Sequence, residues 1–468
     1  MTTPLHRRRM LATATTAIAT LVLLGACAVN PSMRDTSAAD LPPIVFVHGN
    51  GDTAALWHTT LWRFESNGWP RERLHAIDLP YPLARDDDTK PQDGRTSTTE
   101  AMQFLSAEID KVLQRTGARQ VVLFGNSRGG NAIRNYIANG GGMAKVSHAI
   151  LGGTPNHGVW ADKARLPNSE FNGAGPFLTA LNNNPALGGN EVSPGVKWMT
   201  IRSDNNDKFA QPDGVWIGAK GTPTNVGFDS PELKGALNVV IAGIDHRETS
   251  FSPQAFEASY RFITGKAPAL LAIAPEARVV LNGKVSGLGL NNGAGSFVNN
   301  LPLAGATVEV FATNAATGER QGAAVHRQTV GADGLWGPFT VDAKTAYEFV
   351  IGMPGFATTH IYRSPFARSS NIVHLRAARL TDADKAAGSV LTFTRPRGYF
   401  GVPRDRLSLD GASPPPGVPA GVAGVSQSTL RLAAAPPRSV VAEFNGERIV
   451  GRTWPVAENR VVLIELHQ

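Results

Sequence analysis

Short apolar runs alternate with helical patterns over the first part of the chain, from residue 42 to about residue 265. Apolar runs bounded by turn residues are typical of buried strands, and the connections between these runs are long enough to hold helices. The alternation therefore predicts βαβ units and a mostly parallel sheet. The strands are predicted at residues 44–47, 74–77, 120–124, 148–151, 197–201 and 237–242.

The best-defined helix is predicted over residues 98–116. Ser97 and Glu100 have the spacing of a capping box, and Gly117 is a suitable residue to end the helix. Apolar residues recur at helical spacing between these ends, so one face of the helix should pack on the sheet. That face is formed by Met102, Leu105, Ile109 and Val112.

The pattern changes after residues 264–268, where short alternating strands separated by turn residues replace the longer units. This pattern predicts an antiparallel β-sandwich or barrel. We therefore expect an α/β domain over residues 42–266 and an all-β domain over residues 267–468. Strands of the second domain are predicted at residues 278–285, 303–310, 339–341, 347–351 and within 439–466, with an irregular loop at 412–424.

A candidate nucleophile follows the predicted strand at residues 120–124. The strand runs into Gly125-Asn126-Ser127-Arg128-Gly129, a G-x-S-x-G pattern. A sharp turn from strand to helix forces the middle residue into a strained backbone conformation, and flanking glycines relieve the crowding around it. The pattern therefore predicts that Ser127 is raised at the end of the sheet, where a base and a substrate can reach it.

A serine hydroxyl becomes a good nucleophile only when a base accepts its proton and a carboxylate orients that base. In hydrolases with this turn, the carboxylate and then the histidine follow the serine along the chain. His246 follows the predicted strand at 237–242 and is the candidate base. Asp207 and Asp204 follow the strand at 197–201 and are both plausible acids, with Asp229 and Asp245 as further alternatives.

Three further motifs carry a family resemblance. Residues 45–51 contain His48-Gly49-Asn50-Gly51 and resemble the H-G-x-G loop of bacterial lipases, residues 152–158 read GGTPNHG, and residues 177–182 read FLTALN. Residues 42–265 thus resemble a bacterial lipase of the α/β-hydrolase superfamily, close to the class 2 lipases and esterases. The remainder is similar in layout to an archaeal lipase with a C-terminal β-domain.

The resemblance implies the roles of several residues. The backbone N–H groups of Asn50 and Arg128 would form the oxyanion hole, and the ring of His48 would brace the loop. The stretch after Asp207 resembles the D-x-x-V-x-P context of the lipase acid, which favours Asp207 over Asp204. Arg128 departs from the methionine or glutamine found after the serine in many lipases, so the resemblance does not imply a substrate preference.

A long segment at residues 158–194 is rich in asparagine and glycine and is interrupted by apolar residues. Loops of this length near an active site often cover it. We therefore expect a lid or cap over the acyl pocket.

The N-terminus has the order of an export signal. Basic residues precede an apolar stretch at residues 10–24, which is short for a membrane span, and Leu-Gly-Ala-Cys ends at Cys27. This sequence resembles a lipoprotein box, and Cys27 is the single cysteine of the chain. We expect residues 1–27 to be a lipoprotein signal with lipidation at Cys27, residues 28–41 to be a tether, and the protein to lie at the outer membrane or cell surface.

Composition and charge limit the classes of function that the protein can have. The formal charge of +7 includes three arginines of the export signal, and no basic stripe with interleaved aromatics is present, which argues against nucleic acid as a partner. No histidine or cysteine cluster has metal-ligand spacing, and no cofactor is implied. We therefore expect a carboxylic-ester hydrolase of the lipase or esterase type. The alternatives are a polyester depolymerase or amidase with the same triad, and a catalytically silent surface binding protein.

Overall fold

A six-stranded parallel sheet organises the first domain. The computed structural model describes residues 41–204, 206–222, 224–287 and 299–468. The predicted parallel sheet is confirmed, and each strand lies within about two residues of its predicted range. The strand order is β2 (Leu74–Ile77), β1 (Ile44–Val47), β5 (Val121–Asn126), β6 (Val146–Gly152), β7 (Lys197–Ser203) and β8 (Leu237–Ile241).

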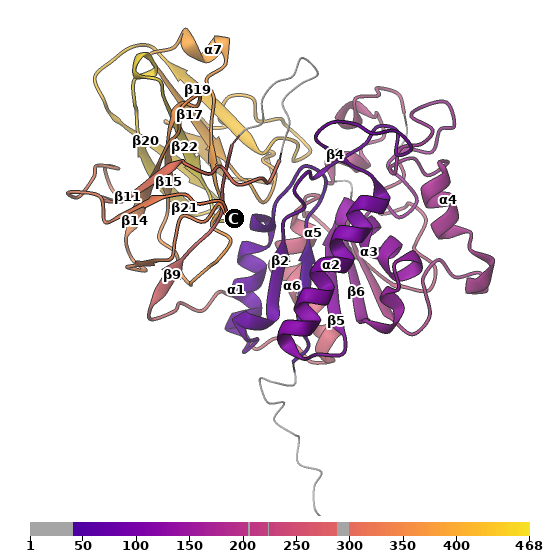
Figure 1. Cartoon of the computed structure of the whole chain (residues 1–468). Helices are drawn as coiled ribbons and strands as arrows, with labels where there is room; N and C mark the ends of the chain where they lie inside the picture. The colour runs from indigo at the N-terminus through magenta and orange to yellow at the C-terminus, as the bar shows by residue number, and fades with distance from the viewer. Residues whose placement is uncertain (1–40, 205, 223, 288–298) are drawn as a thin grey trace, which may run out of the picture. The chain divides into compact units, whose positions relative to one another are not determined.

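Helices cover both faces of this sheet (Figure 1). Successive side chains of a strand point to opposite faces, so Val45 of β1 packs with α2 and α3, whereas Phe46 packs with α1 and α6. Because both faces are buried, β1 and β5 are apolar at nearly every position. The helices are α1 (His58–Ser66), α2 (Thr98–Thr116), α3 (Arg128–Asn139), α4 (Pro176–Asn182), α5 (Glu248–Phe251) and α6 (Pro253–Thr264).

Helix α2 begins and ends at the predicted residues because both of its ends are encoded locally. The side chain of Ser97 accepts a hydrogen bond from the backbone of Glu100, and Glu100 accepts one from the backbone of Ser97. Gly117 adopts φ 65°, a left-handed conformation that costs glycine little, and it closes the last turn.

A seven-stranded mixed sheet dominates the second domain. The predicted β domain is confirmed, but its pairing is not antiparallel throughout: β22 runs parallel to both of its neighbours, β15 and β17, and β10 pairs with β16 in parallel. The chain reaches β22 only after the intervening strands, and such a long return connection permits parallel pairing. The order is β12 (His326–Thr329), β11 (Thr307–Thr313), β14 (Ala346–Gly352), β15 (Thr358–Arg363), β22 (Arg460–Glu465), β17 (Ser389–Thr394) and β19 (Gln427–Leu432).

Smaller sheets pack against this mixed sheet and share its apolar core. The segment predicted as one strand at residues 278–285 is divided into β9 and β10. The remaining elements are β9 (Val279–Leu281) with β13 (Phe339–Val341), β10 (Val285–Gly287) with β16 (Leu375–Ala377), β18 (Leu407–Leu409) with β20 (Ser439–Phe444) and β21 (Glu447–Arg452), α7 (Asp382–Lys385), and, in the first domain, β3 (Leu83–Ala84) with β4 (Arg95–Thr96).

The change from α/β to β structure falls between the end of α6 at Thr264 and the start of β9 at Val279. The boundary predicted at residue 266 lies in this interval and stays a prediction. Residues 41–468 belong to one compact unit, and no helix in the described part of this unit is long and apolar enough to span a bilayer. The predicted signal, the lipidation site at Cys27 and all but the last residue of the predicted tether lie outside the described residues.

Candidate active site

Ser127 lies at the turn between β5, in the middle of the parallel sheet, and α3. Its backbone has φ 51° and ψ −120°, a strained conformation for a residue with a side chain. The turn has no room for other side chains, because a Cβ on Gly125 would lie 2.7 Å from the backbone nitrogen of Gly130. Ser127 N donates to Gly152 O at 2.8 Å, which ties the turn to β6. The sequence therefore folds locally as expected for a raised serine.

Two loops meet the serine turn. A Cβ on Gly49 would lie 3.1 Å from Cβ of Ser127, so the loop after β1 passes directly against the serine. On the other side, a Cβ on Gly153 would lie 3.2 Å from Nδ1 of His246. Ser127 and His246 therefore both border the turn after β6, although the contacts within the described residues do not include a hydrogen bond from Ser127 Oγ to the imidazole. Such bonds are often long in unliganded hydrolases.

His246 and Asp207 form a buried pair. The Nδ1–H group of His246 donates to Oδ2 of Asp207 at 2.7 Å, and the two residues are 5% and 2% exposed. The other carboxylate oxygen, Oδ1, accepts from Phe209 N at 2.8 Å, and the Phe209 ring packs edge-on against the imidazole. Because Nδ1 carries the proton, Nε2 is left as the basic nitrogen of the ring.

The other acid candidates lie elsewhere. Asp204 accepts hydrogen bonds from Asn206 N at 2.9 Å and Gly243 N at 3.0 Å, so it joins the loops after β7 and β8 without touching the imidazole. Asp229 is exposed, and Asp245 binds groups of the second domain. Of the acids considered in the sequence, Asp207 is the one that contacts His246.

Asn50 and Arg128 both offer backbone N–H groups near the serine. Arg128 is the first residue of α3, and N–H groups in the first helical turn lack intrahelical acceptors. The Asn50 side chain fixes its own loop by accepting from Ala84 N at 2.8 Å. Both positions are therefore compatible with the oxyanion hole that the resemblance implies, and these roles stay predictions.

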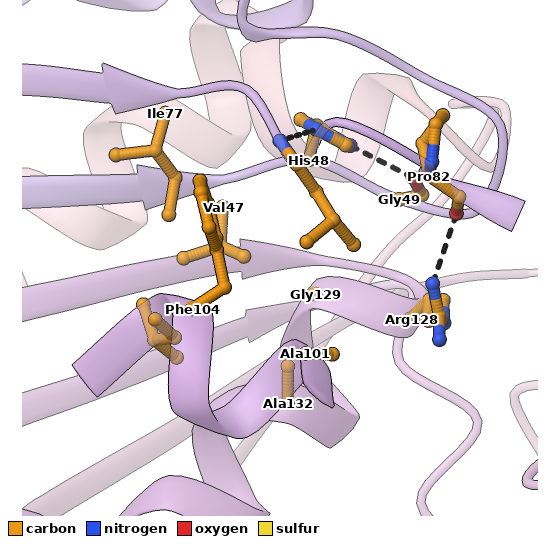
Figure 2. Close-up of a pocket in the computed structure, with 12 residues that line it drawn as sticks. Val47, His48, Gly49, Ile77, Pro82, Ala101, Phe104, Arg128, Gly129 and Ala132 are labelled. Carbon is orange, nitrogen blue, oxygen red and sulfur yellow. Dashed lines mark hydrogen bonds between the residues drawn. The ribbon is translucent and has the colours of Figure 1, made fainter. Parts of the chain in front are cut away.

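The ring of His48 braces the loop through two hydrogen bonds, as Figure 2 shows. Its Nδ1–H donates to Gly49 O at 2.9 Å, and its Nε2 accepts from Leu79 N at 3.1 Å. Burial lowers the pKa of His48 below its usual value, so the ring is neutral at pH 7 and can hold both bonds.

The Arg128 side chain has a separate, structural role that the sequence did not reveal. It is buried and donates to Glu170 Oε1 at 2.6 Å and to Thr96 O at 2.6 Å. It also donates to Pro82 O at 3.0 Å (Figure 2). Glu170 belongs to the segment predicted to be a lid, so this ion pair fastens the segment to the start of α3. The sequence contains one signal for this role, because Arg128 stands where many lipases have an uncharged residue. An arginine that is buried at such a position requires a carboxylate partner.

A pocket of about 20 Å³ lies beneath the loop of residues 48–51 and is lined mainly by apolar side chains, among them Val47, Ile77 and Phe104 (Figure 2). This volume holds about one water molecule and is too small for an acyl chain. Among the described residues, no group of histidine, cysteine and acidic side chains is arranged to hold a metal ion.

The second domain holds the loop that carries His246. Asp245 is fully buried, and its Oδ2 accepts from Arg395 Nη1 and from Tyr399 N, both at 2.8 Å. Its Oδ1 accepts from the backbone of Arg247 and Glu248 at 2.8 and 3.0 Å. Sequence patterns do not reveal these partners, because Arg395 and Asp245 lie in different domains and no local pattern connects them.

The comparisons with known proteins agree with this architecture. The family described as "alpha/beta hydrolase fold" matches residues 42–184, and the family described as "Lipase C-terminal domain" matches residues 277–380. The first match includes the Ser127 turn, and the second covers β9 to β16 of the second domain.

Several solved structures are similar to this chain. Bacillus licheniformis lipase BlEst2 in its mature form is 20% identical, with a TM-score of 0.34, over 48% of this chain and 92% of that protein. Aspergillus fumigatus lipase B is 12% identical, with a TM-score of 0.36, over 49% of this chain and 54% of that protein. Bacillus subtilis carboxylesterase CesB is 13% identical, with a TM-score of 0.26, over 48% of this chain and 85% of that protein.

The parallel sheet, the strained serine turn and the two family matches lead to one assignment. Residues 42–184 match the α/β-hydrolase fold and residues 277–380 match the lipase C-terminal domain, so the chain resembles a lipase-like α/β-hydrolase with a C-terminal domain.

Proposed function

We propose that the protein is a serine hydrolase that cleaves carboxylic esters through an acyl-enzyme intermediate. The observation that carries this proposal is the buried 2.7 Å bond between His246 and Asp207 beside the strained turn of Ser127. A base, its orienting carboxylate and a raised hydroxyl are the groups that acyl transfer by a serine requires.

In the proposed mechanism, Ser127 Oγ attacks the ester carbonyl while its proton passes to Nε2 of His246. Asp207 keeps the imidazole in the tautomer that can accept this proton and stabilises the imidazolium that forms. The backbone N–H groups of Asn50 and Arg128 donate to the oxyanion of the tetrahedral intermediate. His246 then protonates the leaving alcohol, and the acyl group stays on Ser127.

Water completes the reaction in the second half. His246 removes a proton from the water, the resulting hydroxide attacks the acyl carbonyl, and the proton returns to Ser127 Oγ as the acid leaves. The cycle needs no group beyond these side chains and backbone donors.

Covalent labelling with a fluorophosphonate probe tests the proposal. We expect the wild type to be labelled and Ser127→Ala not to be labelled. Ser408→Ala, which changes a partly buried serine of β18 outside the site, should be labelled like the wild type. If the folded wild type is not labelled, the catalytically silent binding protein becomes the better hypothesis.

Hydrolysis rates on p-nitrophenyl esters of increasing acyl length distinguish the types of ester hydrolase. A preference for long chains supports a lipase, and a preference for short chains supports an esterase. Cleavage of a polyester film at a rate comparable to that on p-nitrophenyl esters would favour the depolymerase. Cleavage of anilides at such a rate would favour the amidase.

We also propose that the mature chain is a lipoprotein anchored through Cys27 at the outer membrane or cell surface. The support is the Leu-Gly-Ala-Cys sequence after an apolar stretch. In cells given labelled palmitate, the wild type should incorporate the label and Cys27→Ala should not.

A further inference from the structure

A cavity of about 290 Å³ lies between the hydrolase domain and the second domain. Its volume is at the lower end of the range found for small-molecule sites. Asp52 and Arg247 line it from the hydrolase domain, and Arg376, Arg397 and Glu465 line it from the second domain.

The two carboxylates of the lining already have partners. Asp52 Oδ2 lies 3.0 Å from Arg247 Nε, and Glu465 is paired with Arg363. Asp52 and Glu465 offset part of the positive charge of Arg376 and Arg397, but neither carboxylate forms an ion pair with these two arginines in the described part of the chain.

Arg376 and Arg397 form no ion pair with any described carboxylate, although both are buried or partly buried. Arg397 is 1% exposed, and within the described part of the chain its guanidinium donates to backbone carbonyls, those of Ala55, Leu466 and His467. Arg376 lies in β16, is partly buried, and makes no hydrogen bond or ion pair with any described residue. Its five N–H donors therefore remain available to the cavity.

Burying a guanidinium without a counter-charge is unfavourable, and an oxyanion is the ligand that its planar fork fits best. A carboxylate or phosphate can accept two parallel charge-assisted hydrogen bonds from one arginine. The charges of this cavity therefore favour an oxyanion over a neutral or cationic ligand.

The cavity adjoins both loops of the proposed catalytic site. Asp52 lies two residues after Asn50, and Arg247 directly follows His246. We propose that the cavity binds an oxyanion, a carboxylate or phosphate group, carried by the ester substrate, so that anionic esters are the preferred substrate class. This inference rests on the proposed function, which supplies the reaction.

Two matched substrate pairs test the preference, one with the charge on the acyl part and one with it on the alcohol part. The first pair is p-nitrophenyl hydrogen suberate and p-nitrophenyl octanoate, and the second is lysophosphatidic acid and the monoacylglycerol with the same acyl chain. We expect kcat/KM to favour the charged member of at least one pair by about tenfold, the effect of one charge-assisted hydrogen bond.

Arg376→Gln should lose about tenfold more activity on the charged ester than on the neutral one, because it removes the charge that the oxyanion contacts. Arg376→Lys should retain part of the preference. Arg278→Gln, which changes an exposed arginine outside the cavity, should behave as the wild type. Circular dichroism and the Tm check that each variant is folded.

Binding to Ser127→Ala separates this inference from the proposed function. Calorimetric titration with suberate and with inorganic phosphate should show binding that the added Arg376→Gln change abolishes. If this binding occurs but the wild type cleaves no ester, the anion site stands and the proposed function fails.

Two outcomes would overturn the inference. Cleavage of neutral esters without binding of either anion would leave the proposed function intact and refute the site. Binding of inorganic phosphate without any preference for charged esters would refute the assignment to substrate and indicate a site for a free anion.

Discussion

At the scale of single residues, the choice between two acids near His246 depends on one contact. Asp207 accepts the imidazole N–H at 2.7 Å, whereas Asp204 accepts backbone N–H groups of two loops. Both aspartates follow the same strand and are separated by only three positions, so the difference arises from how the loop folds after β7.

Asp207→Asn should lower kcat on p-nitrophenyl butyrate by on the order of 10³- to 10⁴-fold, because an amide can hold the imidazole in the wrong tautomer. Asp204→Asn leaves the contact with His246 in place, so its kcat should fall far less. Equal losses in the two variants would show that the acid is assigned wrongly.

At the scale of elements, the segment at residues 158–194 is held more firmly than a mobile lid. Arg128 and Glu170 are both buried, and Arg134 donates to Asn182 Oδ1 at 2.7 Å and to Glu191 O at 3.1 Å. Elements that open easily have few such buried bonds. We therefore interpret the segment as a fixed cap rather than a gate.

Arg128→Met should lower the free energy of unfolding by about 3–5 kcal/mol, because it leaves a carboxylate buried without its partner. The double variant Arg128→Met, Glu170→Gln should recover part of this loss. As a control, Arg261→Met breaks the exposed pair with Glu257 on α6 and should cost less than about 1 kcal/mol. Urea unfolding measures all three, and a small effect of Arg128→Met would contradict the fixed cap.

The sequence predicts elements well where the signal is local. The six parallel strands follow from short apolar runs, and both ends of α2 follow from Ser97 and Gly117. The same local signal located Ser127 on its turn and placed His246 and Asp207 after later strands. It could not predict the parallel pairing of β22, because that pairing depends on where a long connection returns.

At the scale of the whole molecule, the second domain supports the proposed catalytic site. Arg395 Nη1 binds Asp245, the residue before His246, and Lys208, the residue after Asp207, donates to Gly424 O at 3.1 Å. These contacts join residues that are far apart in the sequence, which is why sequence patterns do not reveal them.

Arg395→Met should lower kcat for p-nitrophenyl butyrate, with a smaller effect on KM, because the loop that positions His246 loses its anchor while the substrate contacts stay. Arg395→Lys should restore part of kcat, since it keeps a charge near Asp245. An unchanged kcat in a folded Arg395→Met variant would show that the hydrolase domain orients His246 without the second domain.

Acid should destabilise the protein before its carboxylates are protonated. Burial lowers the pKa of His75 and of His148 to about 4, whereas an unfolded histidine titrates near about 6.5. Between these values the unfolded chain binds more protons, so the free energy of unfolding falls as the pH is lowered. The Tm should therefore drop from pH 7 to pH 5, and His148→Gln should make this drop smaller. A Tm that stays constant over this range would contradict the expectation.

The anchoring of Asp245 by Arg395 and Tyr399 has a consequence for engineering. Chimaeras that combine the hydrolase domain of one homologue with the β domain of another would separate the loop that carries His246 from Arg395 and Tyr399, which hold it in place. Such recombinants should work only when residues 243–248 and 395–404 come from the same parent, so that the two segments are inherited together.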